Sequence, residues 1–163
     1  MCAMSLGYVP VTVESTCRTS AATAMEVIAP IDLPTIFTGM GPLPAVREVR
    51  DQSGPWDTAG NTRTVVLSDG STAREELTGY TRARHFSYEL TEFTGTMRRL
   101  VAKVDGEWTF TPAGRNSLVR WTYSFFPHPG RTRLVRYIVA PLWRRYATAT
   151  LARAIREAEQ ATV

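Results

Sequence analysis

Glu75 is the residue of this chain best placed to do chemistry, because it falls among apolar residues on one face of an expected strand. The segment 71–80 alternates in polarity and puts Glu75 on the same face as Ala73 and Leu77. Burial raises the pKa of a carboxyl group, so a buried carboxyl can hold a proton and pass it to a bound molecule. Three structural alternatives stand beside this one: a one-residue register shift, a bulge that exposes Glu75, and a salt bridge to an arginine at the core edge.

The expected pairing around Glu75 follows from a hairpin signal. The dipeptide Asp69-Gly70, between the strand-like segments 62–68 and 71–80, predicts a two-residue type I′ turn. The resulting pairs are Ser68 with Ser71, Val66 with Ala73, Val65 with Arg74, Thr64 with Glu75 and Arg63 with Glu76. Arg63 is therefore expected on the water-facing side, away from Glu75.

The next strand, 84–92, is expected to bring aromatic residues to the face that carries Glu75. The predicted neighbours are Tyr88 with Leu77, Leu90 with Glu75 and Phe86 with Gly79. This register turns His85 to solvent, and His128 lies in a Pro-rich turn. Since neither histidine has a nearby nucleophile, and no phosphate loop or metal-ligand spacing occurs, hydrolase, NTPase and metal-binding functions are not expected.

The segment 106–129 predicts a hairpin with a strongly aromatic face. If the turn lies within 113–116, Trp108 faces Trp121 across the strands. The residues of this face are Trp108, Phe110, Val119, Trp121, Tyr123 and Phe125. Aromatic residues at strand spacing form either ordinary core or the wall of a cavity, and the pattern alone leaves both open.

The segment 141–160 predicts a long amphipathic C-terminal helix. Its apolar stripe comprises Leu142, Trp143, Tyr146, Ala147, Thr150, Leu151, Ala154, Ile155 and Ala158. Small residues in the middle, Ala147, Ala149 and Thr150, are expected to leave space between helix and sheet, and that space makes a pocket possible.

The N-terminal half predicts a strand, two short helices and a second strand. A strand is expected over 9–19, helices over 21–28 and 33–37, capped by Ser20 and Asp32, and a strand over 45–51. Residues 1–8 are expected to form a poorly ordered tail. Trp56 lies in the turn-rich loop 53–61, where a large ring covers either the rim of the core or the mouth of a pocket.

Composition indicates one domain over residues 1–163. The chain is 44% hydrophobic and 21% charged, and no apolar run approaches the ~20 residues of a membrane helix. Cys2 and Cys17 do not make a disulfide framework, and no secretory signal is visible, so we expect a cytoplasmic protein. Cys17 is read as a small apolar residue, with a reactive thiol as the alternative. Nothing in the sequence assigns an oligomeric state.

The net charge of +4 comes from arginines spread along the chain, which does not favour nucleic-acid binding. One local concentration stands out, and it consists of Arg131, Arg133, Arg136, Arg144 and Arg145. This basic patch is either an ordinary solvated face or a weak contact site for an anionic membrane or an acidic partner protein.

The predicted order of elements resembles the START/Bet v 1-like helix-grip superfamily. That resemblance implies an α+β fold in which a curved antiparallel sheet of about seven strands wraps a long C-terminal helix. More narrowly, four segments resemble the SRPBCC group of polyketide cyclase/dehydrase-like proteins: DLPTIFTGMGPLPAV, NTRTVVLSDGSTAREELTGY, FSYELTEF and GEWTFTPAGRNSLVRWTYSFFP. The match covers nearly the whole chain, but it supplies no catalytic motif to transfer.

The resemblance implies a hydrophobic small molecule, such as a lipid, polyketide or quinone, held between sheet and helix without a cofactor or metal. The expected ligand-binding residues are Glu75, Leu77, Phe86, Tyr88, Trp108, Phe110, Trp121, Tyr123, Leu142 and Tyr146. In the alternative function, a polyketide cyclase or dehydratase, Glu75 moves the proton while Tyr88 or Tyr123 polarises a carbonyl. A third alternative is an interaction or membrane-surface module that uses the basic patch.

Overall fold

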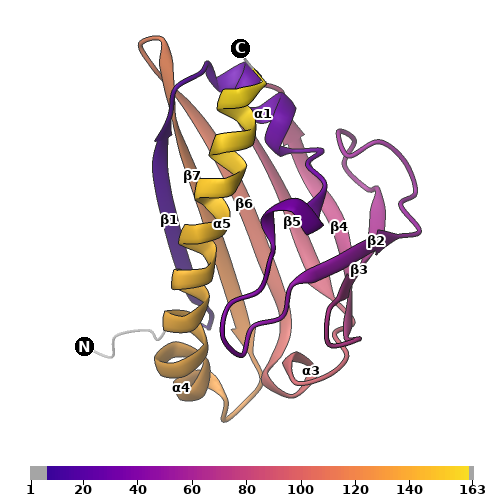
Figure 1. Cartoon of the computed structure of the whole chain (residues 1–163). Coiled ribbons are helices and arrows are strands. Elements are labelled where there is room, and N and C mark those ends of the chain that lie inside the picture. The colour runs from indigo at the N-terminus through magenta and orange to yellow at the C-terminus, as the bar shows by residue number, and fades with distance from the viewer. Residues whose placement is uncertain (1–6, 162–163) are drawn as a thin grey trace.

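Seven antiparallel strands form one curved sheet around a long helix in the computed structural model, which describes residues 7–161 (Figure 1). The strands are β1 (Val9–Cys17), β2 (Val46–Arg50), β3 (Thr62–Leu67), β4 (Thr72–Thr81), β5 (His85–Thr91), β6 (Val101–Ala113) and β7 (Asn116–Pro127). Their order across the sheet is β1-β7-β6-β5-β4-β3-β2. The chain crosses from β1 to the far edge and returns through successive antiparallel neighbours, which confirms the helix-grip expectation.

The helices are α1 (Ala21–Ile28), α2 (Leu33–Ile36), α3 (Met97–Leu100), α4 (Thr132–Leu134), the π-helical turn η1 (Val135–Val139) and α5 (Ala140–Gln160). Ser20 caps α1 as expected, because its Oγ accepts a hydrogen bond from the Thr23 N–H at 3.2 Å. Asp32 precedes α2 but makes no side-chain capping bond. The sequence did not predict α3, α4 or η1, which are too short to show a helical period.

The hairpin between β3 and β4 has a three-residue loop, so the predicted register is wrong by one residue. The Leu67 N–H donates to the Ser71 carbonyl at 2.8 Å, and Gly70 adopts a left-handed φ of +86°. This is the turn-plus-bulge geometry of a longer hairpin loop, not a type I′ turn. Arg63 therefore pairs with Glu75 and points inward, whereas the expected register turned it to water.

The pairing of β4 with β5 agrees with the prediction near Glu75 and departs from it farther along. Leu77 pairs with Tyr88 and Glu75 with Leu90, as expected. A register shift between Leu77 and Gly79 then sets Phe86 opposite Tyr80 instead of Gly79. Trp108 pairs with Trp121, which confirms the predicted hairpin of β6 and β7.

The helix α5 packs mainly against β1 and α1, on one side of the curved sheet (Figure 1). Its small residues Ala147, Thr150 and Ala154 are buried at 2%, 0% and 0% exposure, so they let the helix approach its neighbours closely. The expectation that small residues in mid-helix open a space is therefore wrong.

Of the expected N-terminal tail, residues 1–6 lie outside the described residues, and Tyr8 stacks on Phe126 with ring centroids 5.4 Å apart.

Gly106 makes room for a tyrosine on the inner face of the sheet. It pairs with Tyr88 of the neighbouring strand, and the Tyr88 ring lies where a side chain at position 106 would be. A Cβ atom at Gly106 would lie 2.1 Å from Cζ of Tyr88. The absence of a side chain at this one position therefore fixes where the Tyr88 hydroxyl points.

We expect Gly106→Ala to lower the free energy of unfolding by about 3 kcal/mol, because the new methyl group forces the Tyr88 ring away. Urea denaturation measures this loss. The control is Gly7→Ala, since a Cβ atom at Gly7 meets nothing within 4 Å and should cost little. In a Tyr88→Leu background the alanine should cost clearly less, and an unchanged cost there would refute the steric explanation.

Candidate functional site

A cavity of about 430 Å³ lies between the inner face of the sheet and the N-terminal half of α5. Strands β3 to β7 form its floor, while α2, the loop 39–44, α3 and the first turns of α5 close it. Eight of the ten expected site residues line it: Glu75, Phe86, Tyr88, Trp108, Trp121, Tyr123, Leu142 and Tyr146. Leu77 and Phe110 are buried in the core outside the lining.

The floor of the cavity contains a buried ion pair. An Arg63 guanidinium nitrogen, Nη2, donates to Glu75 Oε1 at 3.0 Å, and the two side chains are only 6% and 7% exposed. The Arg63 guanidinium carbon also lies 3.9 Å from the centroid of the Trp56 ring. Trp56 therefore covers the arginine from the loop, in agreement with the expectation of a ring at the rim of the core.

Glu75 places a buried titratable carboxyl group on the cavity lining. Burial raises the pKa of Glu75, and the charge and hydrogen bond of Arg63 oppose this rise. The carboxyl group is buried, and its inward position on β4, opposite Leu90 of β5, is the predicted one, although its predicted partner on β3 is wrong. The alternative of a salt bridge between Glu75 and an arginine is present in the structure. Its partner is Arg63, which the predicted register placed on the outer face.

Aromatic side chains build the rest of the wall. The Trp121 indole Nε1–H donates to the Tyr88 hydroxyl at 2.9 Å, and Trp121 stacks on Trp108 with centroids 4.6 Å apart. Tyr123 packs against Trp143 of α5 at 4.3 Å. Burial raises the pKa of Tyr88 and of Tyr123, so both hydroxyls stay protonated and available as donors.

Two buried donor nitrogens on the cavity wall have no hydrogen-bond partner among the described residues. They are Nε of Arg63 and Nε1 of Trp143, and both residues line the cavity. A buried polar group without a partner is costly, and native proteins rarely keep one without a reason. The pattern fits a site where an acceptor atom of a bound molecule completes the hydrogen bonding.

One tyrosine joins α5 to the loop that closes the cavity. The Gly39 N–H donates to the Tyr146 hydroxyl at 3.0 Å, and that hydroxyl donates to the Pro44 carbonyl at 3.1 Å. The loop residues Pro42 and Leu43 lie on the cavity lining beside Leu142. Tyr146 therefore serves as a wall residue and also holds the closing loop in place.

Sequence reasoning missed two important residues of this site. Arg63 was assigned to the outer face because the hairpin loop was taken as one residue too short. Trp143 was placed on the inner stripe of the helix but not among the ligand contacts. Its position one turn before Tyr146, on the same stripe, was the available signal.

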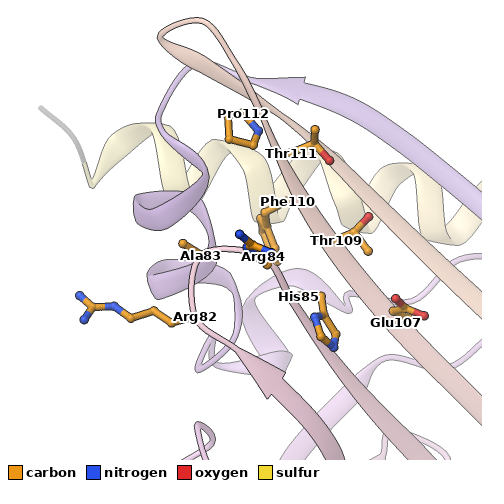
Figure 2. Close-up of a pocket in the computed structure, with 9 residues that line it drawn as sticks. All are labelled: Arg82, Ala83, Arg84, His85, Glu107, Thr109, Phe110, Thr111 and Pro112. Carbon is orange, nitrogen blue, oxygen red and sulfur yellow. The ribbon is translucent and has the colours of Figure 1, made fainter.

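Other parts of the described chain offer no comparable site. A hollow at the β4–β5 turn, shown in Figure 2, is lined by Arg82, Ala83, Arg84, His85, Glu107, Thr109, Phe110, Thr111 and Pro112. Its labelled side chains spread along the turn and strand, and Arg82 points away from His85 and Glu107 (Figure 2). Burial raises the pKa of the Cys17 thiol, which disfavours the reactive thiolate.

Within residues 7–161 no group of three or more His, Cys, Asp or Glu side chains is arranged to hold a metal ion. Over the same residues, no helix has the length and apolar character needed to cross a bilayer.

Residues 9–159 match the model of a protein family described as polyketide cyclase / dehydrase and lipid transport. None of the curated proteins matches the chain in sequence.

Several solved structures share the fold. The crystal structure of Ara h 8.0201 is 16% identical, with a TM-score of 0.66 over 92% of this chain and 97% of that one. A norcoclaurine synthase mutant from Thalictrum flavum, in complex with a transition-state analogue, is 17% identical, with a TM-score of 0.70 over 96% and 97%. The protein XoxI from Bacillus cereus is 14% identical, with a TM-score of 0.60 over 94% of each chain. At these identities the likeness concerns the fold.

The buried ion pair generates a prediction about stability. Arg63→Met leaves Glu75 buried without a countercharge, so the free energy of unfolding should fall by about 3–5 kcal/mol. The double variant Arg63→Met/Glu75→Leu should recover most of that loss, because two apolar residues need no mutual compensation. Urea denaturation of both single variants and the double variant gives the coupling energy.

The matched control is the exposed cross-strand pair Arg120–Glu14, whose N–O distance is 2.8 Å. Arg120→Met should cost less than about 1 kcal/mol, since solvent screens this pair. A double variant at 63 and 75 that loses the sum of the two single losses would contradict the account.

Proposed function

Because the chain belongs to the polyketide cyclase / dehydrase and lipid transport family, we propose that it binds a small hydrophobic molecule in the cavity between sheet and α5. The observation that carries this proposal is an apolar, aromatic cavity of about 430 Å³ into which a few polar groups converge. Such a cavity has the size and lining typical of small-molecule sites. Lipids, polyketides and quinones are the classes of ligand that suit it.

The polar groups narrow the chemistry of the ligand. Arg63 Nε and Trp143 Nε1 are unpaired donors on the wall, and the Tyr123 hydroxyl is a further donor. Unpaired donors favour a ligand that carries acceptor oxygens, such as a carbonyl, on an apolar or aromatic body. We therefore favour a ketone-bearing polyketide or quinone-like molecule over a plain hydrocarbon chain.

The proposed contacts are the wall residues that face the cavity. Glu75, Phe86, Tyr88, Trp108, Trp121, Tyr123, Leu142 and Tyr146 were expected from the sequence, and Arg63 and Trp143 join them. Leu77 and Phe110 support this wall from the core behind it. We further propose that the protein works in the cytoplasm without a cofactor.

Filling the cavity should weaken ligand binding. Ala73 lies on the cavity floor, so Ala73→Phe should weaken binding of the fluorescent probe 1-aminoanthracene at least about tenfold, by occupying the volume the probe needs. The matched control is Ala152→Phe, which adds the same ring on the exposed side of α5 and should bind the probe as wild type does. Equal affinity of the wild type and Ala73→Phe, both folded by circular dichroism, would place the probe elsewhere.

A second function is favoured by the position of Glu75. Its carboxyl group lies on the cavity floor with a raised pKa, and the Tyr88 and Tyr123 hydroxyls lie on the same wall. In a polyketide cyclase or dehydratase, Glu75 would take the proton from a carbon next to a ketone. The same carboxyl would then return a proton to the departing or newly formed hydroxyl, while a tyrosine stabilises the enolate oxygen.

The isosteric variant Glu75→Gln distinguishes between the two proposed functions, a ligand carrier and an enzyme. If the protein cyclises or dehydrates a poly-β-ketone thioester, Glu75→Gln should lower turnover about 100-fold or more, because the amide cannot accept the proton. The affinity for 1-aminoanthracene should change less than about threefold, since size and shape are kept. Product formation followed by mass spectrometry measures turnover. Unchanged turnover in the variant would remove Glu75 from the mechanism.

A further inference from the structure

Three of the exposed large hydrophobic side chains lie on one side of a single helical turn. Leu134, Tyr137 and Ile138 are 40%, 67% and 55% exposed, and Tyr137 and Ile138 follow Leu134 by three and four residues. We call these three residues the apolar tip. On the other side of the same turn Val135 is fully buried and Val139 lines the cavity. A helical turn that is apolar on both sides can bury only one of them inside its own domain. The exposed apolar side is then stabilised when a second apolar environment covers it.

Arginines surround the apolar tip. Arg98 and Arg99 on α3, with Arg131, Arg133 and Arg136 around α4 and η1, are all exposed, and we call these five residues the basic rim. The ion pairs among the described residues do not include any of them.

His128 connects the two parts of the rim. Its ring Nε2 lies 3.0 Å from the Arg98 carbonyl oxygen, while its carbonyl accepts from the Arg131 N–H at 3.0 Å. The two segments that carry the five arginines are therefore both in contact with His128.

A long stretch of the sequence that includes α4 and η1 contains no acidic residue. From Trp108 to Arg156, both included, the chain contains nine arginines and no aspartate or glutamate. The exposed acids on the α3 side include Glu92, in the connection before α3, and Asp69, which lines the cavity together with Met97. The five arginines of the basic rim outnumber these two acids, so the surface is positive, and within residues 7–161 its apolar centre remains exposed.

This surface borders one end of the cavity. Met97 and Leu100 of α3, Val139 of η1 and Leu142 of α5 all line the cavity, and they are neighbours in sequence of the basic rim and the apolar tip. Figure 1 shows α3 and α4 at the same end of the molecule, opposite the end at which α5 finishes. A hydrophobic ligand leaving the cavity at this end would meet the apolar tip first.

We infer that the apolar tip and the basic rim dock this protein on an anionic lipid membrane, with this end of the cavity facing the bilayer. This inference rests on the proposed function, because it supplies the route by which a hydrophobic ligand enters. Arginines around an exposed apolar cluster match the two layers of such a membrane: lipid phosphates outside and acyl chains beneath. An acidic protein would satisfy the arginines but would give Tyr137 and Ile138 no comparable apolar layer.

Co-sedimentation with lipid vesicles tests the inference. The wild-type protein should bind phosphatidylserine/phosphatidylcholine vesicles and should bind pure phosphatidylcholine vesicles much more weakly. Each basic residue near an anionic surface strengthens binding about fivefold, so Arg133→Glu/Arg136→Glu should weaken binding at least about 25-fold. The variant Tyr137→Ser/Ile138→Ser keeps the charge and should still weaken binding about tenfold or more, because it removes the inserting side chains.

The matched control reverses the same number of charges at the other end of the molecule. Arg115 in the β6–β7 turn and Arg156 near the end of α5 are exposed, so Arg115→Glu/Arg156→Glu should bind vesicles nearly as wild type does. An equal loss in this control would mean that only net charge matters and would overturn the inference. Binding to soluble polyglutamate but not to anionic vesicles would overturn it too, in favour of an acidic partner protein.

The vesicle experiments test the docking surface, and the probe experiments test the cavity, independently of each other. Binding of 1-aminoanthracene is measured in solution without vesicles, and vesicle binding is measured without the probe. Loss of vesicle binding with intact probe binding refutes the docking surface alone. Absence of probe binding in the wild type, with intact vesicle binding, refutes the proposed function while the docking surface stands.

Discussion

The fold depends on a mismatch of width: the inner face of a seven-stranded curved sheet is wider than one helix can cover. The helix α5 settles on the β1 side, where alanines and Thr150 allow close packing with β1 and α1. The inner face of β3 to β5 is then left to short helices and loops, which close it at the edges but do not fill it. Dense packing on one side therefore leaves a cavity on the other.

That uncovered half of the sheet also carries Arg63 and Glu75, the two buried charged residues among those that the structure describes. Arg63 and Glu75 face each other across β3 and β4, and Trp56 covers the arginine from outside. A buried ion pair contributes little net stability compared with apolar residues of the same volume. Its presence on the cavity floor, beside unpaired donors, is easier to understand as recognition of a ligand than as support for the fold.

The sequence predicted the order of elements, the aromatic hairpin and the inward position of Glu75, because alternation and turn residues are local signals. The predicted β3–β4 register was wrong because it depended on the length of one loop. Asp69-Gly70 has the composition of a two-residue turn, yet the loop includes Ser68, and that single residue turned Arg63 from the surface to the cavity. The sequence placed the cavity between sheet and helix but not its cause, since the cavity depends on where α5 lies across the sheet and not on small residues in the middle of the helix.

A crystal structure of the protein with 1-tetralone, a bicyclic aromatic ketone, tests the central claim most directly. The account predicts that the rings lie between the sheet and α5, among Trp121, Tyr123 and Trp143. It also predicts that the carbonyl oxygen lies within about 3 Å of Arg63 Nε or Trp143 Nε1, the length of an ordinary hydrogen bond. A cavity that stays empty at saturating ligand, or a ketone whose oxygen points at the apolar wall while both nitrogens remain unpaired, would contradict it.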